Sequence, residues 1–548
     1  MTKGNDSIIS GGFISSLGIF FTKFLGILYA IPLTNYMGSS NGSYFIFGSQ
    51  VIEIGLGLAI SGFPFATAAL ISVYQERGKG SKMVAVERVS GNLMTLTGLL
   101  LFVILWFIGP PLSKLVLDGG NTESLQIMTN VFRLSGLSLL FVSQLGNIRG
   151  FFQGLKDMRT YANSQLFEQI SKIVFLVASD VLLITILKFD SVYGLYIGIL
   201  AFGVSALMAS VALRLKMRRT TVFRRFGYRT LQLRARWKMS REILQLAVPY
   251  ALMSVLSYGN NMIEMLLYVR ALKTFGLEAL MAQEAYGVYG WVMKIISIPL
   301  VLAPGFSIAI IPYLSQAVEQ GKRSKINRLL REAFEAAMIV TIPLCLGLAF
   351  YAKGVLYMFY GADQTSQGLR ILGEGVGMLK IVSLLTFISV LYVMCGTTLI
   401  ALGLRRKNML YLGIGLLVKL VMFYPCTWLF GYLGSFMSTI LSSIIYLLLS
   451  FAALRRAYGF QARTMLYRMI FMGVVGMLMI IPALLFDRLP LPFGGGIKSR
   501  LLVTAVTGVF ALLSASIYLL IMDRAGLLKA VLKRDLSSIF SRLKRQKA

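Results

Sequence analysis

Histidine is absent from this sequence of 548 residues, and cysteine occurs only three times. Without histidine, the Ser-His and Cys-His nucleophile pairs and the HExxH zinc motif are excluded. Cys345, Cys395 and Cys426 show no paired or metal-like spacing, so we expect neither a disulfide framework nor a metal site. A GxxxxGK[ST] loop for nucleotide phosphates is also missing. We therefore predict that the protein is not an enzyme and that it requires no cofactor.

Charged residues are scarce as well. They make up 14% of the chain, whereas 57% of its residues are hydrophobic and the mean hydropathy is +0.75. This composition is too apolar for the surface of a soluble protein. Apolar runs of about 20 residues or more recur, each long enough to cross a bilayer core of ~30 Å, and they predict an all-α membrane protein with about fourteen transmembrane helices. The predicted spans are residues 10–31, 44–74, 89–113, 126–150, 161–187, 191–213, 243–270, 286–314, 332–352, 376–402, 409–430, 432–454, 466–486 and 499–522.

Lysine and arginine, 54 in all, gather in every second connection between the predicted spans. Because basic residues collect in cytoplasmic loops, this pattern places both termini on the cytoplasmic side of the membrane. The most basic connection, residues 214–241, contains no acidic residue, and Leu231, Leu233 and Trp237 interrupt its charges. That mixture is typical of a segment lying on anionic membrane lipids. We therefore attribute the net charge of +32 to the membrane surface and expect no nucleic-acid partner.

A stretch near the second span recurs in the second half of the chain. Residues 62–120 align with residues 305–363 without a gap, matching Gly62 with Gly305 and Lys79 with Lys322. Six predicted helices separate the copies, so both have the same orientation, and we predict two pseudo-symmetric six-helix lobes with the substrate route at their interface. The predicted division is a first lobe at residues 1–213, a basic cytoplasmic linker at 214–242, a second lobe at 243–457, and two extra helices with a basic cytoplasmic tail at 458–548.

Several stretches of the sequence resemble a known group of transporters. They are RGFFQGLKDMRTYANSQLFEQ at residues 149–169, GFPFATAALISVYQERG at 62–78, and GFSIAIIPYLSQAVEQGK at 305–322 with MFYG at 358–361. The likeness extends over essentially all predicted helices and is to bacterial polysaccharide-biosynthesis exporters of the SpoVB-like and MurJ-like type. These exporters belong to the multidrug, oligosaccharidyl-lipid and polysaccharide (MOP) exporter superfamily.

The resemblance implies a flippase in the bacterial cytoplasmic membrane. Its implied substrate is an undecaprenyl-pyrophosphate-linked glycan, above all the peptidoglycan precursor lipid II, carried by alternating access, with cell-wall synthesis proteins as partners. In the MurJ-like group, arginines on helices 1, 2 and 8 meet the anionic headgroup in a central cavity. Lys23 and Lys294 lie at two of those positions, and Tyr29 lies where a second arginine of helix 1 is common. Helix 2 departs from the pattern, because Glu53 is its only charge.

Ionisable side chains deep in a bilayer are costly, so each needs a partner, a wet cavity or a route to the surface. We interpret Lys23 as a pyrophosphate ligand, with a buried pairing to a carboxylate such as Glu53 as the alternative. Glu53 is in turn a candidate cavity carboxylate in the substrate-binding site, with ion coupling or that structural pair as its other possible roles. Glu168 and Lys172 are spaced i,i+4, which predicts a salt bridge on one helix face.

Other functions remain open at this stage. The cargo could be another lipid-linked polysaccharide unit. A cation-coupled multidrug antiporter of the same superfamily would favour an acidic cavity, whereas Lys23 and Lys294 are basic. A non-transporting scaffold would gain nothing from the cost of buried charges. A membrane glycosyltransferase would need acidic residues in its outer loops, which are short and poor in acids here.

Overall fold

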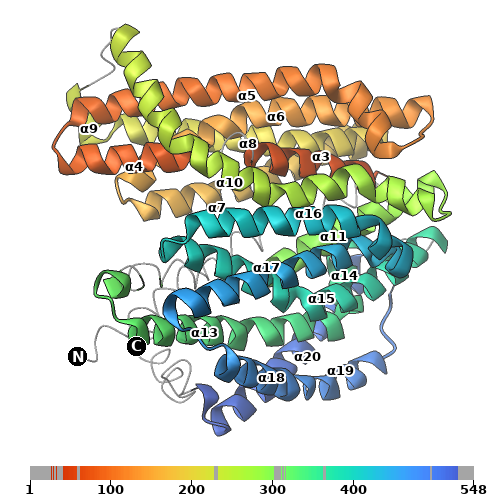
Figure 1. Cartoon of the computed structure of the whole chain (residues 1–548). Helices are drawn as coiled ribbons and strands as arrows, with labels where there is room; N and C mark the ends of the chain where they lie inside the picture. The colour runs from red at the N-terminus through yellow and green to blue at the C-terminus, as the bar shows by residue number, and fades with distance from the viewer. Residues whose placement is uncertain are drawn as a thin grey trace, which may run out of the picture. The chain divides into compact units, whose positions relative to one another are not determined.

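The computed structural model describes residues 26, 29, 33, 41–57, 62–226, 233–300, 310, 314, 316–361, 366–493 and 497–528. Within these ranges the chain is helical and contains no strand (Figure 1). Its contacts divide the chain into two compact units, Leu28–Gly290 and a unit formed chiefly by Trp291–Ala548. The predicted all-α class is therefore confirmed.

The unit Leu28–Gly290 is a bundle of long helices. In chain order they are α3 (Gly42–Gly55), α4 (Gly62–Glu76), α5 (Gly80–Leu117), α6 (Thr122–Gly154), α7 (Met158–Asp180), the π-helical η2 (Val181–Ile186), α8 (Ser191–Arg218), α9 (Thr221–Phe226), α10 (Leu233–Thr274) and the first part of α11 (Ala279–Leu300). α5 packs along α6, and α8 packs against both α6 and α7 (Figure 1).

Glycines let the helices of this unit approach one another closely. A Cβ added at Gly150 of α6 would lie 2.7 Å from the carbonyl oxygen of Pro64 in α4, and one at Gly62 would overlap the backbone of Ala247 in α10. Small residues at such crossings are typical of helix packing in membranes. Gly62 is the first residue of the repeated stretch 62–120, so at this position the repeat serves to pack α4 against α10.

The second unit contains the remaining described helices. They are α13 (Arg323–Phe350), α14 (Ala352–Tyr360), α15 (Ser366–Ala401), α16 (Arg405–Phe430), the short 3-10 turn η3 (Gly431–Leu433), α17 (Gly434–Tyr458), α18 (Arg463–Met477), α19 (Ile480–Asp487) and α20 (Ile497–Arg524). α16 packs along α17, and α13 packs along α15 (Figure 1). The Tyr351 hydroxyl donates a hydrogen bond to the carbonyl oxygen of Phe510, 3.0 Å away, and so joins the end of α13 to α20.

Helices occupy the predicted spans from residue 89 to 270 and from 376 to 522, with ends that differ by several residues. Among the described residues, nine helices are long and apolar enough to cross a membrane, which supports a multi-pass membrane protein. The first predicted span, 10–31, lies almost entirely outside the described residues. Pro64 is tolerated because it lies in the first turn of α4, where its missing N–H has no helical partner to lose. The total of fourteen spans and the two-lobe division stay predictions.

The predicted basic linker, residues 214–242, contains helices at both ends. α8 continues to Arg218, α9 follows, and α10 already begins at Leu233. α10 is thus one helix of 42 residues that joins the end of the basic segment directly to the seventh predicted span. Met239, Ile243 and Ala247 are buried in the core of the first unit and are spaced i,i+4, so one face of α10 anchors the basic segment.

Asp157 caps the N-terminus of α7. Its carboxylate accepts hydrogen bonds from the Thr160 backbone N–H at 3.0 Å and from the Thr160 hydroxyl at 2.5 Å. These two bonds lower the pKa of Asp157 below its ordinary value. The cap therefore stabilises the folded chain at pH values above the ordinary Asp pKa of about 3.9, and this contribution is lost as the pH falls through the lowered pKa.

Replacing Asp157 with alanine should reduce the free energy of unfolding by roughly 0.5–2 kcal/mol at neutral pH, because the N-terminal N–H groups of α7 lose their acceptor. Thermal unfolding of the purified protein, followed by circular dichroism, measures this change. Asp157→Asn is the control, since asparagine caps helices about as well. A loss of equal size in both variants would show that the cap does not stabilise α7.

Candidate functional site

Glu53 lies on the one uncovered face of α3. Twelve residues of this helix are buried, whereas Gln50 is partly exposed and Glu53 is exposed. Gln50 and Glu53 are spaced i,i+3 and therefore share a face. The helix thus presents a narrow polar stripe with a single accessible carboxylate.

Two tyrosine phenols interact electrostatically with the Glu53 carboxylate. Tyr258 of α10 packs so closely against Gly57 that a Cβ there would overlap its ring. Tyr286 of α11 stacks on Phe47 of α3, with ring centroids 4.1 Å apart. The exposed carboxylate therefore lies within electrostatic range of phenols from two neighbouring helices.

A second carboxylate, Glu264 of α10, belongs to the same group. It is buried, and it accepts a hydrogen bond from the Tyr289 hydroxyl at 3.1 Å. The Tyr268 ring lies 5.2 Å from that of Tyr289 and 5.3 Å from that of Tyr286. Glu264 also interacts electrostatically with Tyr286, so a buried and an exposed carboxylate both lie within electrostatic range of that phenol. We name this group the carboxylate-tyrosine cluster, which comprises Glu53, Glu264, Tyr258, Tyr268, Tyr286 and Tyr289.

The carboxylate-tyrosine cluster contains oxygen atoms and no nitrogen or sulfur ligand. Oxygen ligands of this kind suit a proton or a hard cation. In the part of the chain that the structure describes, no group of three or more His, Cys, Asp or Glu residues is placed to hold a metal ion. The oxygen atoms of the cluster can bind a proton or a hard cation.

Lys294 lies on α11 and is half-buried. Its Nζ atom is 5.2 Å from the centroid of the Trp291 ring, and Trp291 in turn packs against Tyr360, with ring centroids 4.7 Å apart. The Tyr360 hydroxyl donates to the Trp291 carbonyl oxygen at 3.1 Å, so the aromatic platform is fixed by α14. A cation over the face of a tryptophan ring is attracted by the negative face of the ring. Lys294 is thus a positioned positive charge within α11.

Lys23 lies outside the described residues. Its predicted roles, as a ligand for the pyrophosphate or as the partner of Glu53, stay predictions. α3 covers the first part of the second predicted span. Glu53 is the one charged residue of α3, and the helix contains no arginine.

Glu168 forms an ion pair with Arg149 of α6, whose guanidinium lies 2.8 Å from the carboxylate, and the predicted pairing of Glu168 with Lys172 stays a prediction. The same guanidinium donates to the Ser164 hydroxyl at 2.9 Å, and both side chains of the ion pair are largely buried. A guanidinium that reaches two acceptors from the facing helix is a better partner than a lysine of the same helix.

Lys172 is buried among aromatic rings. Its Nζ atom lies 4.1 Å from the Phe202 ring centroid and 5.5 Å from that of Tyr29, and 3.5 Å from the side-chain oxygen of Gln169. Cation–π contacts of this kind stabilise a charge that is removed from water. These contacts hold the Lys172 ammonium group within the first unit.

Asp180 is another buried carboxylate of the first unit. It is fully buried, and within the described residues neither of its oxygen atoms has a hydrogen-bond partner. It is the last residue of α7, directly before the π-helical η2, Val181–Ile186. A π-helical turn widens the helix and often occurs at functional sites. A buried carboxylate without a partner is costly when it is charged.

Replacing Asp180 with asparagine should stabilise the protein by about 1–3 kcal/mol, because it removes a charge whose burial is not compensated. The thermal unfolding temperature in detergent measures the change. Asp487→Asn, the same substitution at an exposed position at the end of α19, should leave the unfolding temperature unchanged. A lower unfolding temperature for Asp180→Asn would show that the folded state needs the charged form.

The chain was compared with known protein families and proteins. Residues 8–318 match the model of a family described as "Polysaccharide biosynthesis protein". The chain belongs to this family. Residues 249–425 also match the MatE model, which extends the likeness into the second half of the chain. The polysaccharide-biosynthesis and MOP-superfamily membership that the sequence motifs predicted is therefore confirmed.

Curated members resemble the chain over much or all of its length. It is 24% identical over 549 residues to "Lipid II flippase MurJ" of Bacillus subtilis (strain 168), covering 98% of both proteins. It is 21% identical over 384 residues to "Stage V sporulation protein B" of the same organism, covering 68% of each. These relatives indicate a transporter within the polysaccharide biosynthesis family.

Solved structures of transporters share the fold. The structure titled "Lipid II flippase MurJ, inward closed conformation" matches with a TM-score of 0.66 at 16% identity, covering 92% of this chain and 98% of that one. An inward-facing multidrug resistance MATE family transporter of the MOP superfamily matches with a TM-score of 0.62 at 15% identity, covering 81% and 99%. The chain therefore has the fold that MurJ and MATE transporters share.

Proposed function

We propose that this protein translocates an undecaprenyl-pyrophosphate-linked glycan, lipid II, across the bacterial cytoplasmic membrane by alternating access. The observation that carries the proposal is the likeness to a lipid II flippase over nearly the full length of both chains. The basic loops support a cytoplasmic position for both termini. No covalent bond is made or broken in this process, so the protein has only to bind the headgroup, shield it and release it.

In this proposal the positive charges Lys294 and Lys23 meet the diphosphate. Lys294 is suited to the task because its ammonium group is half-buried and rests on an aromatic platform. A lysine binds phosphate as a compact point charge, without the fixed geometry of a guanidinium fork. Such contacts favour turnover, since the substrate has to leave on the other side. The isoprenoid chain would stay in the lipid throughout.

The carboxylate-tyrosine cluster supplies the coupling step in this proposal. Glu53 is accessible and Glu264 is buried, and both interact with Tyr286. A proton or monovalent cation bound there would change the charge of the first unit by one. Glu53→Gln removes the titratable group while keeping the size of the side chain. We expect this variant to bind the substrate but to lose the dependence of transport on an ion gradient, measured in proteoliposomes with and without that gradient.

Reconstitution tests the proposed function directly. Purified protein in proteoliposomes should move fluorescent lipid II from the inner to the outer leaflet, which an added quencher or a glycan-modifying enzyme detects. Depletion of the protein in its host should likewise leave lipid II on the inner leaflet. Unchanged lipid II accessibility in both experiments would reject lipid II as the cargo.

A cation-coupled multidrug antiporter is the second candidate. The MatE match and the two carboxylates of the carboxylate-tyrosine cluster favour it. The same proteoliposomes distinguish the two functions, because an antiporter would move a cationic dye such as ethidium against an imposed ion gradient. The flippase proposal expects no dye transport.

A further inference from the structure

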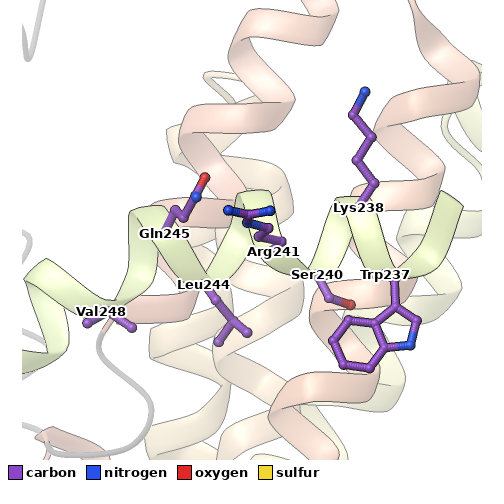
Figure 2. A pocket seen from close by; sticks show the side chains of 7 residues that line it. All are labelled: Trp237, Lys238, Ser240, Arg241, Leu244, Gln245 and Val248. Carbon is purple, nitrogen blue, oxygen red and sulfur yellow. The ribbon is translucent and has the colours of Figure 1, made fainter. Parts of the chain in front are cut away.

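The basic N-terminal half of α10 has two faces. Met239, Ile243 and Ala247 are buried in the first unit. The opposite side lines an open groove of about 830 Å³, shown in Figure 2. The lining residues of this groove within the described chain are Trp237, Lys238, Ser240, Arg241, Leu244, Gln245 and Val248. We name it the α10 groove.

The charges of the α10 groove are available to a ligand. Lys238 and Arg241 are exposed, and neither forms an ion pair or hydrogen bond within the described residues. The neighbouring acid, Glu242, is partly buried and accepts a hydrogen bond from the Tyr74 hydroxyl of α4 at 3.2 Å, so it is held against the core of the unit. The groove therefore presents two positive charges and is complementary to an anion.

The side chains of the α10 groove change in character along the helix. Trp237, with 74% of its surface exposed, comes first. Lys238 and Arg241 follow within the next turn, and Leu244 and Val248 come last. From Trp237 to Val248 the helix rises about 16 Å. Aromatic, cationic and apolar groups thus succeed one another from the basic end of α10 toward its predicted membrane span (Figure 2).

This order matches the order of chemical groups in a lipid-linked glycan. An exposed tryptophan face offers an apolar surface on which a sugar ring can stack, and an N–H that can donate a hydrogen bond. Arginine and lysine are the common ligands of phosphate groups, and exposed leucine and valine suit a hydrocarbon chain. Ser240 and Gln245 add a hydroxyl and an amide that can bond sugar hydroxyls or phosphate oxygens.

We propose that the α10 groove is a cytoplasmic docking site for the lipid-linked glycan before it enters the transport pathway. Arg241 and Lys238 bind the diphosphate, Trp237 stacks on the first sugar, and Leu244 and Val248 contact the first isoprene units. The inference rests on the proposed flippase function and adds a second substrate contact, separate from Lys23 and Lys294. It gives the basic segment before the seventh predicted span a role in loading.

Binding measurements on the full-length protein test the docking site. The protein is placed in nanodiscs of phosphatidylcholine and titrated with two probes, undecaprenyl diphosphate and N-acetylglucosaminyl-diphospho-undecaprenol. Arg241→Gln should weaken binding of both probes by about tenfold, because a charge-assisted contact to phosphate is lost. Trp237→Ala should weaken binding of the sugar-bearing probe alone. Trp237→Phe should restore it in part, since phenylalanine keeps an aromatic face.

Arg236→Gln is the matched control, because it removes the same charge from the same basic part of α10, five residues before Arg241, but does not line the groove. It should change binding less than twofold. Equal losses in Arg236→Gln and Arg241→Gln would overturn the proposal, because they would indicate general attraction of a basic helix to anionic lipid. Phosphatidylglycerol that competes with the probes at equal concentration would overturn it too, by making the groove a phospholipid site.

Transport measurements separate this inference from the proposed function. If wild-type protein flips lipid II and Arg241→Gln raises the substrate concentration needed for half-maximal flipping, both proposals hold. If the wild type flips lipid II and Arg241→Gln behaves in the same way as the wild type, the docking site is wrong and the flippase stands. If the wild type does not flip lipid II, the proposed function fails whatever the groove binds.

Discussion

Replacing Lys294 with alanine should reduce lipid II transport by ten- to a hundredfold while leaving the protein folded in the membrane. The variant removes a positive charge that, in the proposed function, meets the diphosphate. Hydrogen bonds to charged groups contribute about 1.5–3 kcal/mol, which corresponds to this range of rates. The initial rate of flipping in proteoliposomes measures the effect. Lys294→Arg should retain most of the activity, because it keeps the charge and can also rest on the Trp291 ring.

Lys353→Ala is the matched control for Lys294→Ala. Lys353 belongs to the same unit and also lies over an aromatic ring, with its Nζ atom 4.1 Å from the centroid of Phe493. It has no proposed contact with the substrate, so its loss should not change the rate. Lys23→Ala is expected to act as Lys294→Ala does. Full activity in both Lys23→Ala and Lys294→Ala would refute the proposed diphosphate contacts.

The helices of this protein were largely predictable because their signals lie along the chain itself. An apolar run long enough to cross a bilayer and a basic loop beside it can be read without knowledge of the fold. α16 and α17 illustrate this, since the predicted span 409–430 falls within Arg405–Phe430 and all but the first two residues of the span 432–454 fall within Gly434–Tyr458. Their ends extend farther because a helix can continue into the polar region with charged residues such as Arg405 and Arg455.

The partner of Glu168 could not be predicted in the same way. The i,i+4 rule concerns one isolated helix, where Lys172 is the nearest cation in sequence. In the folded chain, the turn between α6 and α7 brings Arg149 opposite Glu168. The cross-helix pair also involves Ser164, so the guanidinium satisfies two acceptors. Tertiary packing therefore gives Glu168 a partner that a rule for one isolated helix does not predict.

The candidate site was only half predictable for a related reason. Glu53 stood out as the single charge of an apolar span, whereas Glu264 was given no role. Glu264 and Tyr268 are spaced i,i+4, and Tyr286 and Tyr289 are spaced i,i+3, so each pair shares a helix face. These spacings suggest a polar face on two consecutive helices. That the two faces meet, with Tyr289 donating to Glu264, is known only from the packing of α10 against α11.

Replacing Arg468 with methionine should destabilise the second unit by about 3–5 kcal/mol, the usual cost of leaving a buried charge without its partner. Glu335 of α13 is 1% exposed, and its carboxylate lies 2.6 Å from the Arg468 guanidinium of α18. Its other oxygen has no partner within the described residues, so it depends on that one contact. The pair joins α18 to α13 through a carboxylate that is removed from solvent.

The double variant Glu335→Leu with Arg468→Met decides what the ion pair contributes. It should recover most of the stability lost in Arg468→Met, because no unpaired charge remains and the substitutes can pack in the bilayer. Arg463→Met, near the start of α18, is the control, since Arg463 contacts only the exposed ring of Tyr467 in the described chain. Thermal unfolding of the four proteins in one detergent measures these differences. If Arg468→Met unfolds at the wild-type temperature, apolar packing alone attaches α18, and the pair is retained for another reason.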